Sequence, residues 1–253
     1  MAQVYFELRD AIVHAVGESC RGERVGVLFS GGLDSTLVAH LAKPRAKEAV
    51  LFTAGVEGAP DVECAKRVAK ELGMELELIL LSGEEVVGLY DEAMKIYPDD
   101  FLKVELSVPV LVCCRRAKGK NLRVLLAGAG AEELFGGYQR HWEAYERGDD
   151  VREMLESELN ALYSGDVARN SAVARSEGME LRCPLLDEEV VGLARQIPVS
   201  EKFAGERKGV LRAIARELGV PEEACARRKQ ALQYGSGVHK VLLKRFGRAR
   251  KNI

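Results

Sequence analysis

The stretch that decides the fold is Arg24–Lys43, which reads RVGVLFSGGLDSTLVAHLAK. Its first part, Arg24–Phe29, is short and almost wholly apolar, which predicts a buried strand. Its last part, Ser35–Lys43, has the residue pattern of a helix. The glycine-rich segment Ser30-Gly31-Gly32-Leu33-Asp34-Ser35 joins the two. A loop of this kind between a strand and a helix presents backbone N–H groups to an anion, so we expect a phosphate site here.

The composition of the loop fits that chemistry. Gly31 and Gly32 permit positive φ angles and close approach of the backbone to a ligand. Ser30 and Ser35 can donate their hydroxyls to phosphate oxygens, whereas Asp34 needs a cation such as Mg²⁺ between itself and a polyphosphate. The loop is neither a Walker A loop, because it lacks the lysine, nor a dinucleotide-binding GxGxxG motif. The structural alternative is a tight turn that Asp34 or Ser35 caps.

The rest of the first half repeats the alternation of strand and helix. We predict further strands over 49–54, 75–81 and 122–127, and further helices over 4–16, 61–72, 84–96 and 106–118. Such an alternation, with continuously apolar strands, predicts an α/β fold in which helices cover both faces of a parallel twisted sheet.

After about residue 138 only helical patterns follow, over 138–177, 187–196, 206–218 and 237–246, and no strand is convincing. We therefore expect one domain over 1–253. In it, a nucleotide-binding α/β part over 1–137 is completed by a mostly helical part over 138–253.

Composition excludes several classes of protein. The 253 residues include 47% apolar and 30% charged residues and carry a formal net charge of −2. The charge argues against a dedicated nucleic-acid-binding protein, and no apolar run is long enough to span a membrane. The N-terminal segment does not resemble a secretory signal, and the six cysteines form no CxxC pair, so we expect reduced thiols in the cytoplasm. The scarcity of Asn and Gln suits a thermophile or, equally, a GC-rich genome.

Several motifs together resemble one family. The loop SGGLDS matches the SGGxDS signature of the PP-loop ATP pyrophosphatases. Gly128–Tyr138 (GAGAEELFGGY) resembles the GEGSDExFGGY segment of asparagine synthetases, and Gly178–Asp187 (GMELRCPLLD) resembles their ExRxPFLD segment. Lys208–Arg212 (KGVLR) and Arg227–Lys229 (RRK) are similar to their KxxLR and RxK segments. The chain thus resembles the synthetase domain of the asparagine synthetase family, which implies an adenine nucleotide α-hydrolase-like fold.

The resemblance implies an ATP- and Mg²⁺-dependent ligase. Such an enzyme adenylates a carboxylate substrate, aspartate or a related acid, releases pyrophosphate and transfers ammonia or another amine. Asp34 and Glu132, which stands where the family has Asp, would hold Mg²⁺. Lys229 and Lys208 would be the catalytic cations at the phosphates. The remaining nucleotide-binding positions would be Leu28, Ser30, Gly31, Gly32, Asp34, Ser35, Ala54 and Gly128.

Each of these assignments has a structural alternative. Glu132 can belong to a charged first helical turn, and Lys229 to a solvated basic stretch. Lys208 and Arg212 lie one helical turn apart and can equally form a solvated helix face. Arg182 with Asp187 can line the acceptor pocket or brace the turn around Pro184.

Two departures from the family pattern matter. Ala129 replaces a glutamate thought to stabilise the reacting intermediate near the attacking nitrogen, which removes a candidate acid/base group, and Glu57, Glu105 or Glu180 are possible substitutes. Because the loop motif arrives by residue 30, we expect no glutaminase before it. We expect nitrogen to come from ammonia, another amine or a separate glutaminase subunit, with a homo-oligomer as a further possibility.

Two rival functions stay open. One is adenylation coupled to sulfur transfer, to tRNA or another acceptor, with Cys113 and Cys114 as persulfide carriers. The other is a non-catalytic nucleotide-binding relative of the ligases.

Overall fold

The computed structural model describes residues 2–227 and 232–247, and its centre is a sheet of five parallel strands. In spatial order the strands are β3 (Leu76–Leu80), β2 (Glu48–Gly55), β1 (Arg24–Leu28), β4 (Val124–Leu126) and β5 (Glu180–Arg182). The predicted parallel α/β fold is confirmed. The prediction that the second half holds no strand is wrong, because β5 pairs with β4 in register Leu125 to Leu181.

Helices from both the first and the second half of the chain surround the sheet. Those of the first half are α1 (Ala2–Cys20), α2 (Leu33–Ala42), α3 (Pro60–Leu72), α4 (Gly83–Ile96) and α5 (Phe101–Gly119). The second half contributes α6 (Ala131–Phe135), α7 (Gln139–Arg147), α8 (Val151–Leu162), the π turn η1 (Tyr163–Val167), α9 (Ala168–Ser176), the 3₁₀ turn η2 (Pro184–Leu186), α10 (Glu188–Gln196), α11 (Val199–Lys202), α12 (Gly209–Glu217), α13 (Glu222–Ala226), α14 (Leu232–Gly235) and α15 (Val238–Phe246).

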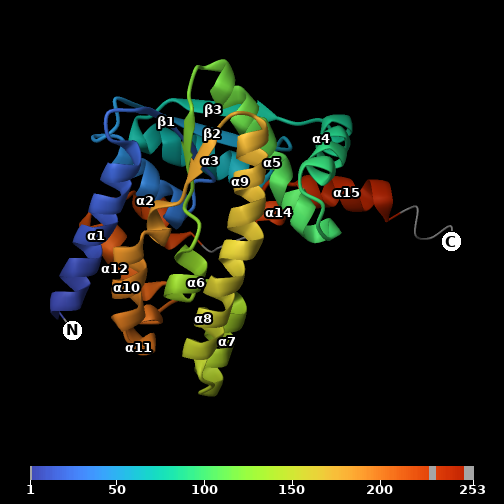
Figure 1. Cartoon of the computed structure of the whole chain (residues 1–253). Helices are drawn as coiled ribbons and strands as arrows, with labels where there is room; N and C mark the ends of the chain where they lie inside the picture. Colours follow the sequence, from blue (N-terminus) through green and yellow to red (C-terminus); the bar gives the residue numbers. More distant parts are fainter. Residues whose placement is uncertain (1, 228–231, 248–253) are drawn as a thin grey trace.

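Alternate strand residues face two separate cores, as expected for a sheet buried on both sides. Val25 and Val27 of β1 join a core with α1, α2, α3, α10 and α12. Val50 and Phe52 of β2 join the opposite core with α4, α5 and α15. Figure 1 shows these two groups of helices on either side of the sheet. Helices from both halves of the chain therefore contribute to each layer.

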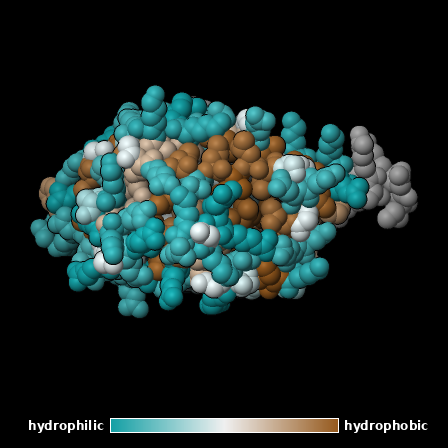
Figure 2. Space-filling model, turned by 90° about the horizontal axis from the view of Figure 1, so that it is seen from above, coloured by the Kyte–Doolittle hydropathy of each residue, from teal (hydrophilic) through white to brown (hydrophobic). Residues whose placement is uncertain are grey.

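The helices α7 and α8 extend away from the sheet as a hairpin (Figure 1). The predicted continuous helix over 138–177 is interrupted because Gly148 ends α7 in a left-handed conformation and the Asp150 side chain caps α8. The hairpin has a small core of its own, in which Leu155 packs with Phe203. No described helix is long and apolar enough to cross a membrane. Figure 2 shows a surface that is mostly hydrophilic, with its most extended hydrophobic area near the middle of the face seen from above.

Strand order places the site. From β1 the chain proceeds to β2 and β3 on one side, and then returns to β4 and β5 on the other. At such a reversal the connections after adjacent strands leave on opposite sides of the sheet, and a crevice opens at the carboxyl ends. Here the crevice lies between β1 and β4, which are followed by the predicted phosphate loop and by the segment that carries Glu132.

Candidate functional site

A pocket of about 290 Å³ lies at the carboxyl ends of β1, β2 and β4. Of the residues predicted for the site, those that line it are Leu28, Ser30, Gly32, Asp34, Ser35, Ala54, Gly128, Glu132 and Lys208. Gly31 lies in the same loop but does not line the pocket, and Lys229 lies outside the described residues. The fold thus brings predicted site residues from separate segments, the first at position 28 and the last at position 208, to one cavity.

The conformation of the loop after β1 depends on its glycines and on hydrogen bonds between its serines. Gly31 has a φ of +70°, and a Cβ there would lie 2.9 Å from the carbonyl carbon of Cys64 on α3. Glycine is therefore needed for its backbone conformation and for its packing. The Ser35 hydroxyl donates to the Gly32 carbonyl at 3.2 Å and lies 3.3 Å from the Ser30 hydroxyl. Gly32 is the N-cap of α2 and has no side-chain capping bond. The Ser30 N–H donates to the Ser35 hydroxyl at 3.3 Å, so Ser35 closes the turn as the structural alternative expects, whereas Asp34 contacts Lys208.

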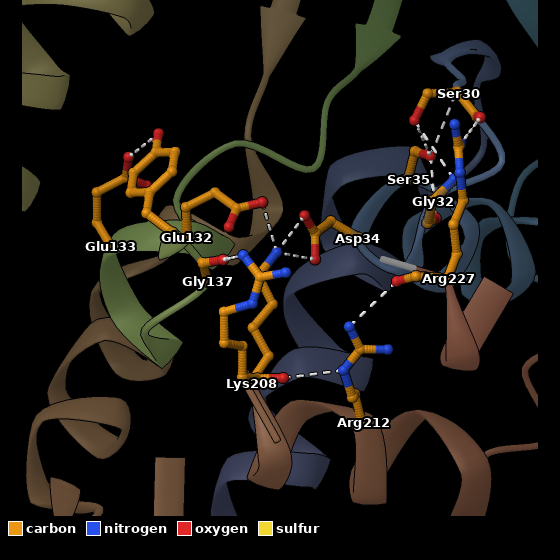
Figure 3. Close-up of polar contacts among 12 residues, drawn as sticks. Ser30, Gly32, Asp34, Ser35, Glu132, Glu133, Gly137, Lys208, Arg212 and Arg227 are labelled. Atoms are coloured by element: carbon orange, nitrogen blue, oxygen red, sulfur yellow. Dashed lines mark hydrogen bonds and ion pairs between the residues drawn. The ribbon is translucent and has the colours of Figure 1, made fainter. Parts of the chain in front are cut away.

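A buried cluster of one lysine and two carboxylates lies beside this loop (Figure 3). Lys208 Nζ donates to Asp34 Oδ1 at 2.8 Å, to Asp34 Oδ2 at 2.7 Å and to Glu132 Oε1 at 2.6 Å. Lys208 is 3% exposed and Glu132 is 6% exposed. The alternative of a solvated helix face for Lys208 is therefore wrong. Glu132 does lie in the acidic first turn of α6, as its alternative expects, and it also has a buried ionic partner there. Charge-assisted bonds in a buried setting are stronger than those at a surface.

The backbone is shaped around this cluster. Lys208 has a φ of +59°, the left-handed conformation that costs a side-chain-bearing residue energy. A Cβ on Gly137 would lie 2.2 Å from Lys208 Cε and 1.7 Å from Glu132 Oε2, so only glycine lets the two side chains meet there. The left-handed backbone of Lys208 and the close approach at Gly137 thus both help to set where the ammonium lies.

Arginines connect the helical part to the glycine-rich loop after β1. The buried Arg212 donates from Nε to the Arg207 carbonyl at 2.9 Å and from Nη2 to the Arg227 carbonyl at 3.2 Å. Arg227 in turn donates to the Ser30 carbonyl and to Asp61 Oδ1, each at 2.6 Å. The sequence motifs included Arg212 and Arg227 without a defined role, and Arg207 was missed. Together they fix the loop after β1 relative to the turn that carries Lys208.

The far end of the pocket is polar and was not predicted. Tyr138 donates its hydroxyl to Glu133 Oε1 at 2.8 Å, and burial together with Glu133 raises the pKa of Tyr138 well above its usual range. Asp166 and Asn170 line the same end from the π turn η1 and α9, and Arg169 Nη2 lies 2.9 Å from Asp166 Oδ1. A π turn often marks a functional position. The one sequence signal was the spacing of Asp166 and Asn170 by four residues within a predicted helix.

The suggested substitutes for the missing glutamate are elsewhere. Ala129 lines the pocket, but Glu57, Glu105 and Glu180 do not. Glu105 is buried against His239, with Oε2 2.9 Å from Nδ1, and Glu180 pairs with Arg182. The carboxylates that do line the far end are Glu133 and Asp166.

Arg182 and Asp187 do not line the pocket at the carboxyl ends of the strands, which argues against the interpretation that they line an acceptor pocket. Arg182 Nη1 donates to the Ser19 carbonyl at 2.8 Å and to Glu23 Oε1 at 2.7 Å. Asp187 accepts a hydrogen bond from the Glu189 N–H at 2.9 Å and so caps α10. Both side chains stabilise local structure.

The adjacent cysteines are poorly suited to sulfur transfer. All six thiols are free, and Cys113 and Cys114 are buried. Burial raises the pKa of both thiols, that of Cys114 to about 12. Since the thiolate is the reactive form, these thiols are predominantly unreactive at neutral pH. Cys113 contributes to the wall of the pocket as a small apolar side chain.

Sequence comparison identifies one family along nearly the whole chain. A family described as asparagine synthase matches residues 7–149 and 141–251. A putative glutamine-hydrolyzing asparagine synthetase 1 of Methanocaldococcus jannaschii is 33% identical over 96% of this chain and 52% of its own length. The glutamine-hydrolyzing asparagine synthetase B of Escherichia coli is 28% identical over 91% of this chain and 45% of its own. The chain spans about half the length of these relatives.

Structural comparison supports the fold. An NMN synthetase from Francisella tularensis superimposes with a TM-score of 0.51 over 96% of this chain and 86% of its own, at 13% sequence identity. At that identity the likeness concerns the arrangement of strands and helices, which agrees with the expected nucleotide α-hydrolase-like fold.

Proposed function

This chain belongs to the asparagine synthase family, and we propose that it is an ATP-dependent ligase that forms an amide through an acyl-adenylate. The observation that carries the proposal is that the glycine-rich loop and the Lys208–Asp34–Glu132 cluster share one pocket. Because Asp34 comes from the α/β part and Lys208 from the helical part, we treat 1–137 and 138–253 as two parts of one catalytic domain.

The nucleotide is assigned to the part of the pocket next to the sheet. Adenine and ribose contact the ends of the strands at Leu28, Ala54 and Gly128. The phosphates lie on the loop, where Ser30 and Ser35 supply hydroxyls and Gly31 and Gly32 supply backbone N–H groups at the start of α2. Lys208 and Lys229 are the cations that stabilise the charge that develops on the phosphates during transfer.

Asp34 and Glu132 fit a divalent cation, because their carboxylates already converge on one positive charge at 2.6–2.8 Å. Carboxylate oxygens are the ligands that Mg²⁺ prefers. Within 2–227 and 232–247, no three or more His, Cys, Asp or Glu side chains lie close enough together to hold a metal ion. Bound Mg²⁺ would neutralise polyphosphate charge and so favour departure of pyrophosphate.

The polar far end is assigned to the acceptor acid. Glu133, Asp166, Asn170 and Tyr138 surround it, and two carboxylates there suit an acid that also carries an ammonium group, such as aspartate or a related amino acid. The acceptor carboxylate attacks the α-phosphorus, pyrophosphate leaves, and an amine then displaces AMP to form the amide. Ammonia, a second amine or a separate glutaminase subunit would supply the nitrogen.

Pyrophosphate release from ATP and Mg²⁺ in the presence of single amino acids tests this proposal. We expect one acid, or a small set, to stimulate release, with AMP and an amide formed in equal amounts once ammonia is added. An Asp34→Asn variant is the control and should lose the stimulation. If no acid stimulates release although the nucleotide binds, the chain is a nucleotide-binding relative without ligase activity.

A further inference from the structure

The Lys208 ammonium occupies the point that the proposed metal would need. It contacts three carboxylate oxygens of Asp34 and Glu132 within 2.8 Å, and these are the two side chains assigned to the cation. The strained backbone of Lys208 and the close approach at Gly137 direct the side chain to this point. One lysine therefore already neutralises much of the charge that would attract a divalent ion.

The ligands at this point are also too few to hold a metal by themselves. In the described part of the chain only these two carboxylates meet here, without a third metal-binding side chain. Mg²⁺ requires six ligands in near-octahedral geometry and loses its water reluctantly. A polyphosphate on the adjacent loop would supply further oxygens. It would also offer the Lys208 ammonium a second anionic partner, since Lys208 lines the same pocket.

We infer that Lys208 is a tethered substitute for the divalent cation, so that the pocket takes up metal only together with nucleotide. The inference rests on the proposed function. Without nucleotide, the ammonium keeps the buried carboxylates paired and excludes the ion. When the metal–nucleotide complex binds, the ammonium transfers from the carboxylates to phosphate oxygens. The same side chain thus keeps metal out of the site when nucleotide is absent and contacts the phosphates when nucleotide is bound.

Binding of Mn²⁺, followed by the electron paramagnetic resonance signal of the free ion, tests this order. The samples are the native chain, Lys208→Gln and the matched control Lys120→Gln, each without nucleotide. Lys120 also lies between two carboxylates, those of Glu75 and Glu77, but at the surface. We expect Lys208→Gln to bind Mn²⁺ at least tenfold more tightly than the native chain, and Lys120→Gln to behave as the native chain does.

Equal Mn²⁺ affinity of Lys208→Gln and the native chain would overturn the inference. A second measurement needs no variant: Mg²⁺ alone should leave the melting temperature of the native chain unchanged, whereas Mg²⁺ with a non-hydrolysable ATP analogue should raise it. A clear rise with Mg²⁺ alone would also overturn the inference. If the analogue with Mg²⁺ has no effect and does not bind, it is the proposed ligase function that fails instead.

Discussion

Two buried lysines, six residues apart, lie in opposite electrostatic surroundings. Lys208 is 3% exposed and contacts the carboxylates of Asp34 and Glu132 in the pocket. Lys202 ends α11 beside the α7–α8 hairpin and is 6% exposed, and no described carboxylate lies within ion-pair distance of it. Burial lowers the pKa of Lys202 to about 8, and the nearby Arg152 adds to this effect.

The contrast between Lys208 and Lys202 shows that the effect of a buried charge on stability depends on whether it has charged partners. At Lys208 the desolvation cost is offset by two partners, and removal of the lysine leaves negative charge buried. At Lys202 the cost is only partly offset by Glu156, and removal of the lysine relieves it. The same substitution, Lys→Met, should therefore change stability in opposite directions at the two positions.

The largest effect is expected for Lys208→Met. The free energy of unfolding should fall by about 3 kcal/mol, because Asp34 and Glu132 lose a shared charged partner in a buried site. The kcat/KM for ATP should fall by about 10²–10³-fold, since a positioned cation is lost from the phosphates. Urea unfolding and steady-state kinetics measure the two. An unchanged unfolding energy would show that the carboxylates do not depend on Lys208.

The strands and the glycine-rich loop that carry the Lys208 pocket could be predicted from the sequence. The strands β1, β2 and β4 were predictable because each is buried between two helical layers and so is apolar at successive positions. The glycine-rich loop was predictable from its own composition, and its residues line one part of the pocket. Asp34, Glu132 and Lys208 were placed by motif, but their mutual contact depends on tertiary packing.

Other parts gave too little local signal. β5 has only three residues, Glu-Leu-Arg, and with an exposed Glu180 and a half-buried Arg182 it does not form an apolar run. The left-handed conformation of Lys208 could not be predicted, since that conformation is normally the preference of glycine or asparagine. The π turn before Asn170 lies within an apparently regular helix. The first two features involve distant segments, since β5 pairs with β4 and Lys208 contacts Asp34 and Glu132.

The second prediction concerns Lys202→Met, which should stabilise the protein at pH 7 by on the order of 2–3 kcal/mol. The folded-state pKa of about 8 lies below the unfolded value of roughly 10.4, so the native chain gains stability as the pH rises from 8 to 10. The variant lacks this gain, and its advantage should disappear near pH 10. Urea unfolding of both proteins at pH 7 and pH 10 checks it, and an advantage that is constant with pH would exclude the proposed cause.

The third prediction tests whether Arg212 holds Lys208 in position in the pocket. Arg212→Met removes the bonds to the carbonyls of Arg207 and Arg227, which hold the turn before Lys208. We expect the KM for ATP to rise about tenfold with a smaller change in kcat, because the loss of a charge-assisted bond costs about 1.5–3 kcal/mol. A fall in kcat alone would instead place Arg212 at the reacting atoms. Arg216→Met, at an exposed pair with Glu222, is the matched control and should have no effect on KM.

The smallest effect is expected at the surface counterpart of Lys208. Lys120 lies between Glu75 and Glu77, as Lys208 lies between two carboxylates, but its side chain is 30% exposed and that of Glu75 is 53% exposed. Water and salt screen such pairs, and their net contribution is about 0–1 kcal/mol. Lys120→Met should therefore lower the unfolding energy by less than 1 kcal/mol, and less again in 1 M salt. If its loss matched that of Lys208→Met, then the number of carboxylate partners, and not their burial, would determine what a lysine contributes in this protein.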